Sequence, residues 1–148
     1  MVLKAELEIA YRLQQDFIKP VKSFIPREYP APVKGNHVEV ISGIRRCGKS
    51  TLMDQIKRRY RGGIGYFNFE DPRVHDFDVV DFPKLDEVIG PKTKTYFFDE
   101  IQNVPSWEIY VRQLHDRSKK VFITGSNASL LSKELGSRLT GRHVRHEL

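Results

Sequence analysis

The sequence has little of what secreted, metal-stabilised and membrane proteins depend on. It contains one cysteine, Cys47, among 148 residues, which excludes an internal disulfide, a cysteine-based zinc finger and a thiol redox pair. No apolar run approaches the roughly 18 residues that a membrane-spanning helix needs. The first eight residues, MVLKAELE, place acidic side chains where a signal peptide would have its apolar segment. We therefore expect a cytoplasmic protein that does not span a membrane.

The rest of the composition is that of a globular domain. Hydrophobic residues make up 39% of the chain and charged residues 30%, which argues against a disordered tail. Four prolines lie within residues 19–36, and this density forbids a helix and indicates an extended connector. We therefore expect an N-terminal helix with its connector over residues 1–35, followed by the main domain over residues 36–148.

The net charge of +6 is unevenly distributed along the chain. Residues 42–64 carry 7 basic and 1 acidic side chains, residues 65–110 carry 4 and 10, and residues 111–148 carry 8 and 3. Such blocks are either solvated faces of opposite sign or sites for polyanions, which include nucleic acid and nucleotide phosphates. The charge pattern by itself leaves these interpretations open.

The main domain alternates predicted strands and helices. Apolar periodicity predicts helices over residues 3–18, 49–60, 83–89 and 107–114, with helical turns over 131–139. Short β-branched or aromatic runs predict strands over residues 37–42, 64–69, 95–98, 121–124 and 143–148. Strands separated by helices indicate an α/β fold with a parallel sheet and right-handed crossovers.

A phosphate-binding loop follows the first predicted strand. Gly43-Ile44-Arg45-Arg46-Cys47-Gly48-Lys49-Ser50 matches G-x-x-x-x-G-K-[ST] at every position, and a predicted helix begins at Lys49. Glycines let the backbone N–H groups face a phosphate chain, and the helix N-terminus adds partial positive charge. We expect Lys49 to reach the β- and γ-phosphates of ATP and Ser50 to hold Mg²⁺. Thr51 completes the predicted cofactor-binding segment.

Cys47 lies inside this loop, beside Arg45 and Arg46. One interpretation is a small residue that fills space. The other is a thiol whose pKa the helix N-terminus and the two arginines lower, which would make it reactive.

Two carboxylates end the third predicted strand. Asp99 and Glu100 follow Tyr96-Phe97-Phe98, and ligands of an open parallel sheet bind beyond the carboxyl ends of its strands. We expect Asp99 to coordinate Mg²⁺ through water, and Glu100 to orient or deprotonate the attacking water. The sequence has no Asn-Lys-x-Asp guanine motif, and the adjacent glutamate favours ATP hydrolysis.

Polar residues also follow the fourth predicted strand. Ser126 and Asn127 are ordinary turn residues, but beside a nucleotide site either could bond the lytic water or the γ-phosphate. Arg138 and Arg142 lie further on, and an arginine that reaches the γ-phosphate stabilises transition-state charge. Most arginines are surface residues, and Arg142 is the candidate for a catalytic role, in its own site or in that of a neighbouring copy in a homo-oligomer.

These motifs resemble the N-terminal ATPase portion of a family of predicted AAA+-superfamily ATPases of archaea and bacteria. The stretches that carry the resemblance are residues 42–51, 66–73, 97–107, 123–131 and 139–142. The resemblance implies a three-layer P-loop core with a five-stranded, mostly parallel sheet in the order 5-1-4-3-2. It also implies Asp99-Glu100 as the Walker B pair, Ser126 or Asn127 as sensor 1, and a C-terminal domain beyond Leu148 in the longer protein.

Three functions compete at this point. The first is a Mg²⁺-dependent ATPase module that binds and hydrolyses ATP and drives conformational change in a larger protein. The second is a nucleic-acid-binding protein with ATP as a regulatory ligand, which the basic block over residues 111–148 motivates. The third is a small-molecule kinase, for which the sequence offers neither an acceptor pocket nor a lid.

Overall fold

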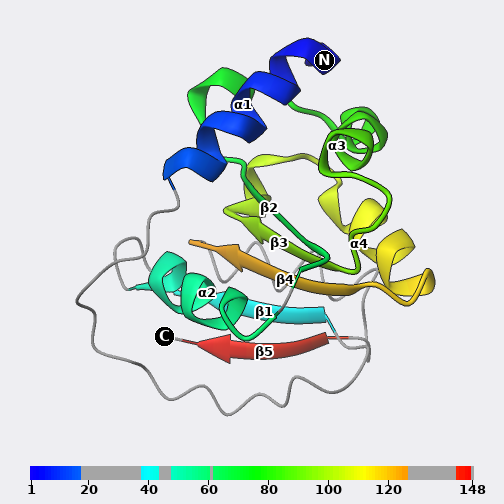
Figure 1. Ribbon diagram of the computed structural model, residues 1–148. Helices are drawn as coiled ribbons and strands as arrows, with labels where there is room; N and C mark the ends of the chain where they lie inside the picture. The colour runs from blue at the N-terminus through cyan, green and yellow to red at the C-terminus, as the bar shows by residue number, and fades with distance from the viewer. Residues whose placement is uncertain (18–37, 44–47, 61, 127–142, 148) are drawn as a thin grey trace.

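Five strands and four α-helices alternate along most of the chain in the computed structural model, which describes residues 1–17, 38–43, 48–60, 62–126 and 143–147 (Figure 1). The strands are β1 (Val38–Ser42), β2 (Ile64–Asn68), β3 (Thr95–Asp99), β4 (Lys120–Gly125) and β5 (His143–Glu147). The α-helices are α1 (Lys4–Phe17), α2 (Lys49–Lys57), α3 (Phe82–Ile89) and α4 (Trp107–Asp116). Three short 3-10 helices are η1 (Pro72–Val74), η2 (Val79–Asp81) and η3 (Ile101–Asn103).

The strands form one sheet in the order β2-β3-β4-β1-β5, and every neighbouring pair is parallel. This confirms the α/β fold, and the order is the 5-1-4-3-2 order that the resemblance implies. Because all strands run the same way, their carboxyl ends meet along one edge of the sheet. That edge is where the phosphate loop and the two carboxylates were expected.

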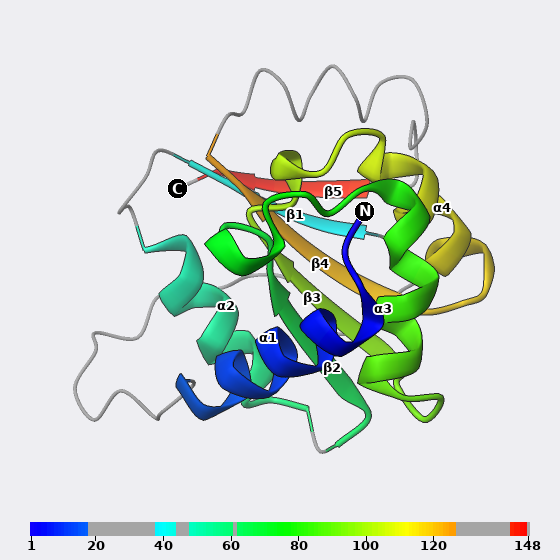
Figure 2. The same cartoon turned by 90° about the horizontal axis from the view of Figure 1, so that it is seen from above.

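Helices cover both faces of the sheet. Figure 2 shows α2 on one side, with α3 and α4 on the other. Alternate residues of each strand point to opposite faces, so β3 gives Tyr96 and Phe98 to the larger core cluster and Phe97 to the smaller cluster beneath α2. Burial on both faces explains why the central strands read as continuous apolar runs rather than as alternating patterns.

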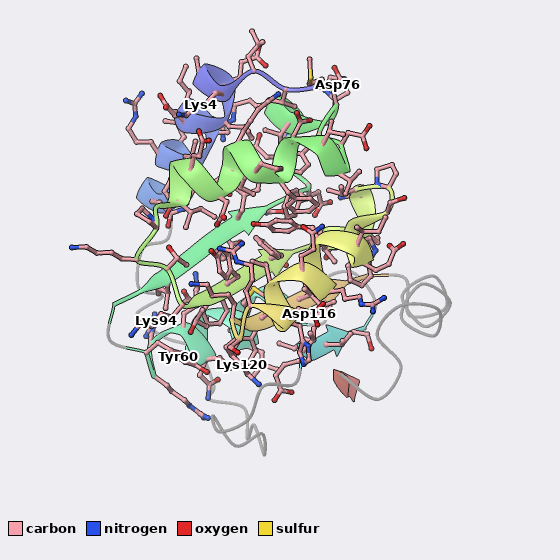
Figure 3. All side chains as sticks on the ribbon, turned by 90° about the vertical axis from the view of Figure 1, so that its right-hand side faces the viewer. Lys4, Tyr60, Asp76, Lys94, Asp116 and Lys120 are labelled. Carbon is pink, nitrogen blue, oxygen red and sulfur yellow. The ribbon has the colours of Figure 1, made fainter. Side chains whose placement is uncertain are left out.

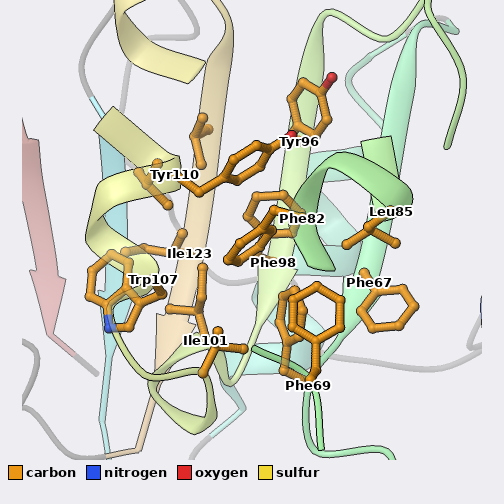
Figure 4. Packing of buried hydrophobic residues seen from close by; sticks show 14 of the residues in the cluster. Phe67, Phe69, Phe82, Leu85, Tyr96, Phe98, Ile101, Trp107, Tyr110 and Ile123 are labelled. Carbon is orange, nitrogen blue, oxygen red and sulfur yellow. The ribbon is translucent and has the colours of Figure 1, made fainter. Parts of the chain in front are cut away.

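Aromatic side chains form a contiguous part of the larger cluster (Figure 4). Phe82 of α3 stacks on Tyr110 of α4, with the ring centroids 4.2 Å apart and the planes inclined by 8°. Phe69 meets the edges of Phe82 and Phe98 at 5.7 and 5.6 Å. Each such pair adds about 0.5–1.5 kcal/mol beyond its buried area. This packing fixes α3 and α4 on the sheet and leaves the carboxyl edge to polar residues.

Helix α1 closes the exposed edge of the sheet at β2. The Gln14 side chain pairs with the Asn68 backbone as a neighbouring strand would, accepting from its N–H at 2.8 Å and donating to its carbonyl at 3.0 Å. Gln15 Nε2 donates to the Tyr66 carbonyl at 3.1 Å. Leu7 and Ala10 of the same helix are fully buried in the larger cluster. An unpaired strand edge invites aggregation, and α1 satisfies the N–H of Asn68 and the carbonyls of Asn68 and Tyr66.

The predicted elements match the structure closely, with a few differences. Helix α2 ends at Lys57 rather than at residue 60, although Tyr60 still packs against the smaller cluster. Between β2 and α3 the sequence patterns predict no helix, but the structure has η1 and η2, which are short and begin at aspartate caps. The helical turns predicted over residues 131–139 lie outside the described residues. The division of the chain near residue 35 stays a prediction.

Candidate functional site at the carboxyl ends of the strands

The sheet register brings the candidate residues together. Asn68 of β2 lies beside Asp99 of β3, and Ser42 of β1 lies beside Gly125 of β4. The pairing of β3 with β4 runs up to Phe98 and Ile123, so the next residues, Asp99 and Thr124, also meet at this edge. Four strands therefore deliver their last residues to one place, although these residues lie up to 83 positions apart in the sequence.

Lys49, the lysine of the predicted phosphate loop, is buried in this place. Gly48 caps α2 with φ 95° and ψ 18°, a left-handed conformation that glycine adopts without strain. Lys49 begins the helix and is only 4% exposed. Its Nζ donates to the Gly43 carbonyl at 2.9 Å and lies 3.7 Å from Glu100 Oε1. The Lys49 ammonium group therefore lies at the N-terminus of α2, and a phosphate could compete with the Gly43 carbonyl and Glu100 for it.

Asp99 ends β3 and is 1% exposed. Tyr66 donates its hydroxyl to Asp99 Oδ2 at 2.9 Å, and Thr124 donates its hydroxyl to Oδ1. Burial raises the pKa of Tyr66, and the adjacent Asp99 carboxylate raises it further, so the tyrosine stays protonated and remains a donor. Two neutral hydroxyls thus orient the carboxylate at the end of the strand.

Glu100 follows in a left-handed backbone conformation, with φ 54° and ψ 49°. Its N–H donates to the Thr124 hydroxyl at 2.9 Å. Its Oε2 accepts from Ser126 Oγ and from Gln102 Nε2, each at 2.7 Å. A non-glycine residue rarely adopts this backbone conformation, and such outliers cluster at functional sites. Here the turn directs Glu100 toward Lys49 instead of continuing the strand.

A second lysine stands behind Asp99. Lys57 Nζ lies 3.9 Å from the centre of the Tyr66 ring and 3.4 Å from Asp54 Oδ1. Burial lowers the pKa of Lys57, and the Asp54 carboxylate offsets part of this change. Its ammonium group lies over the ring of the tyrosine that bonds Asp99, so it contributes positive potential near that carboxylate.

The structure brings five of the predicted site residues into one network: Gly43, Lys49, Asp99, Glu100 and Ser126. Gly48, Ser50 and Thr51 lie at the start of α2, where the sequence predicts them. Ile44, Arg45, Arg46, Cys47, Asn127 and Arg142 lie outside the described residues, and their roles stay predictions.

Sequence reasoning missed three members of the network: Tyr66, Gln102 and Thr124. Each donates to a predicted carboxylate or accepts from its backbone. A signal for Thr124 existed, because a polar residue at the end of a buried strand needs a partner. For Tyr66 and Gln102 no such signal existed, since an aromatic residue in a strand and an amide in a turn are both ordinary.

Three basic residues of the C-terminal block have partners within the protein. Arg117 Nη1 lies 3.5 Å from Asp86 Oδ2, and Lys120 Nζ (Figure 3) lies 3.3 Å from Glu39 Oε1. Lys119 donates to the Thr93 carbonyl at 2.9 Å. These contacts explain part of the block by local pairing, without recourse to nucleic acid.

Two absences concern the described residues only. Residues 1–17, 38–43, 48–60, 62–126 and 143–147 contain no helix with the length and apolarity that crossing a bilayer requires. Within the same ranges, no three histidine, cysteine or acidic side chains form a ready metal cage.

Comparison with known proteins gives one family and two relatives. The profile of a protein family described as "AAA domain" matches residues 35–148. An uncharacterized protein of Methanocaldococcus jannaschii is 37% identical over 127 residues, which cover 84% of this chain and 29% of that protein. An uncharacterized protein of Haemophilus influenzae is 40% identical over 118 residues, which cover 72% of this chain and 30% of that protein. The chain thus spans just under a third of the length of these relatives.

Proposed function

Because the chain belongs to the AAA domain family, we propose that its main domain is a Mg²⁺-dependent ATPase that binds ATP at the phosphate loop and hydrolyses it. One observation carries the proposal. Lys49 and Glu100 lie 51 residues apart in the sequence, yet their side chains meet at 3.7 Å. This contact joins a residue suited to holding phosphates with one suited to activating water.

In this proposal Lys49 changes partners when ATP enters. The phosphates compete with the Gly43 carbonyl and Glu100 for its ammonium group, aided by the N-terminus of α2. Departure of Lys49 leaves Glu100 Oε1 without that cation and facing the phosphates. Glu100 is then placed to accept a proton from water as the water oxygen bonds the γ-phosphorus and the bridging oxygen leaves with ADP.

Asp99 and the start of α2 are the groups that would hold Mg²⁺, with Ser50 contributing its hydroxyl. The fit rests on Asp99, whose buried carboxylate the hydroxyls of Tyr66 and Thr124 hold at the end of β3. Mg²⁺ supplies neutralisation of phosphate charge when it is bound. We further propose that the domain couples this reaction to conformational change within a longer protein.

ATP titration of three variants tests the proposal. Lys49→Ala should weaken ATP binding by about 100-fold or more, because it removes a charged donor to the phosphates. Glu100→Gln should bind ATP normally and turn it over about 100- to 10,000-fold more slowly. Lys94→Ala is the matched control, since Lys94 is exposed at the amino end of β3 (Figure 3). Normal ATP affinity in the Lys49→Ala protein would contradict the assignment.

A further inference from the structure

Gln102 lies in η3, immediately after the predicted Walker B pair, and it has two unusual features. Its Nε2 donates to Glu100 Oε2 at 2.7 Å, a short hydrogen bond for an amide and a carboxylate. Its Oε1 is buried and has no hydrogen-bond partner in the part of the chain that the structure describes. We propose that Gln102 is a positioning residue, which holds Glu100 in the orientation required for water activation.

The two oxygens of Glu100 have different surroundings. Oε2 accepts from two neutral donors, Gln102 Nε2 from η3 and Ser126 Oγ from the end of β4. Oε1 faces Lys49 at 3.7 Å. Two donors on one oxygen fix the rotation of the carboxylate, so the other oxygen is directed at the place where Lys49 now stands. In the proposed function that place receives the phosphates, and Oε1 becomes the proton acceptor.

The backbone supports the same role. The left-handed conformation of Glu100 starts η3, in which the Val104 N–H donates to the Ile101 carbonyl at 3.0 Å. This tight turn folds the chain back so that Gln102 reaches the carboxylate two residues before it. Gln102 is only partly buried, so packing alone does not account for its place in this turn.

The unpartnered Oε1 of Gln102 allows an experiment to distinguish a positioning role of this residue from a structural one. Burying an amide oxygen without a partner costs stability. Gln102→Met keeps the length of the side chain and removes both the donor and the unpartnered oxygen. If Gln102 were mainly structural, the variant would unfold at a lower temperature. Under the present proposal its Tm stays the same or rises, while turnover falls.

Steady-state kinetics and thermal unfolding of the whole chain test the proposal, which rests on the proposed ATPase function. Gln102→Met should lower kcat by about 10- to 100-fold, the loss expected for a hydrogen bond to a charged group, with the Kd for ATP within about twofold of wild type. Asn103→Ala is the control, since it removes an amide from the same turn that bonds Phe69 O rather than Glu100. It should leave kcat unchanged.

A double variant adds a readout that a structural role would not move. Ser126→Ala and Gln102→Met remove the two donors to the same oxygen, so the combined loss in kcat should differ from the product of the single losses. If the loss in kcat of the double variant equals the product of the two single losses, the two donors do not position Glu100 jointly. A wild-type kcat in Gln102→Met would also overturn the proposal. So would a loss of kcat in Gln102→Met that is accompanied by a fall in Tm. Absence of ATP turnover in the wild type would instead overturn the proposed function itself, and this inference with it.

Discussion

Two buried acidic regions of this protein look alike in the sequence and differ in the structure. Asp81, between η2 and α3, is fully buried, and its Oδ2 accepts from the backbone N–H groups of Val2 and Asp78 at 3.1 and 3.0 Å. Lys84 Nζ donates to its Oδ1 at 2.9 Å. At the end of β3, by contrast, Asp99 and Glu100 accept chiefly from side-chain hydroxyls and an amide.

The two regions differ in whether the hydrogen-bond donors around their carboxylates can move. Backbone N–H groups are fixed by the fold, and Lys84 also donates to the Val2 carbonyl at 2.9 Å, so the Asp81 region acts as a clasp between the N-terminus and α3. The donors around Asp99 and Glu100 can turn about their side-chain bonds, and in the proposed function Lys49 leaves its partners for a phosphate. A buried carboxylate is therefore weak evidence for a functional site until the identity of its donors is known.

The largest stability effect is expected at the clasp. Asp81→Ala should lower the free energy of unfolding by about 3 kcal/mol, because it leaves the N–H groups of Val2 and Asp78 without their acceptor and removes the carboxylate that Lys84 pairs with. Urea denaturation measures the change. Asp76→Ala is the control, since Asp76 is exposed. The ATP affinity of the folded Asp81→Ala protein should match wild type, and a selective loss of ATP binding would erase the contrast between the two regions.

A smaller effect is expected at Thr124, which joins the two site carboxylates. Thr124→Val preserves the shape of the side chain but deprives Asp99 of a donor and the Glu100 N–H of an acceptor. We expect a loss of about 2 kcal/mol in the free energy of unfolding, together with slower ATP turnover. Thr124→Ser keeps the hydroxyl and should recover most of both. Equal damage from the two substitutions would mean that the methyl group matters as much as the hydroxyl, which would contradict the role assigned to the hydroxyl.

The same contrast shows what the sequence could predict. Local motifs and strand ends mark the predicted phosphate loop and the Asp99-Glu100 pair in the sequence, and the structure brings Lys49 to 3.7 Å from Glu100. Thr124 and Gln102 were missed because their roles depend on strand register and on a turn of unusual backbone conformation. Asp81 was read as one of ten acids in the block over residues 65–110, since its donors come from a residue 79 positions earlier and from its own turn.

The smallest expected effect is the pH dependence of the stability that Asp81 contributes. Burial alone would raise the pKa of Asp81, but the hydrogen bonds from Lys84, Asp78 and Val2 outweigh burial and hold that pKa below its ordinary value. A carboxylate whose pKa is lowered by folding stabilises the protein above the unfolded-state pKa of about 3.9. This contribution is lost as the pH falls through the lower pKa of the folded state.

The gap in unfolding free energy between wild type and Asp81→Asn should therefore narrow as the pH falls from about 6 to about 3, because protonation removes from the wild type what the variant already lacks. Urea titrations at several pH values measure this gap. Asp76→Asn should show a gap near zero throughout, since its carboxylate is exposed and contributes little. If the gap for Asp81→Asn stayed constant, the shape and hydrogen bonding of Asp81, rather than its charge, would account for its contribution to stability. The donors around Asp81 would then act as they would on a neutral group.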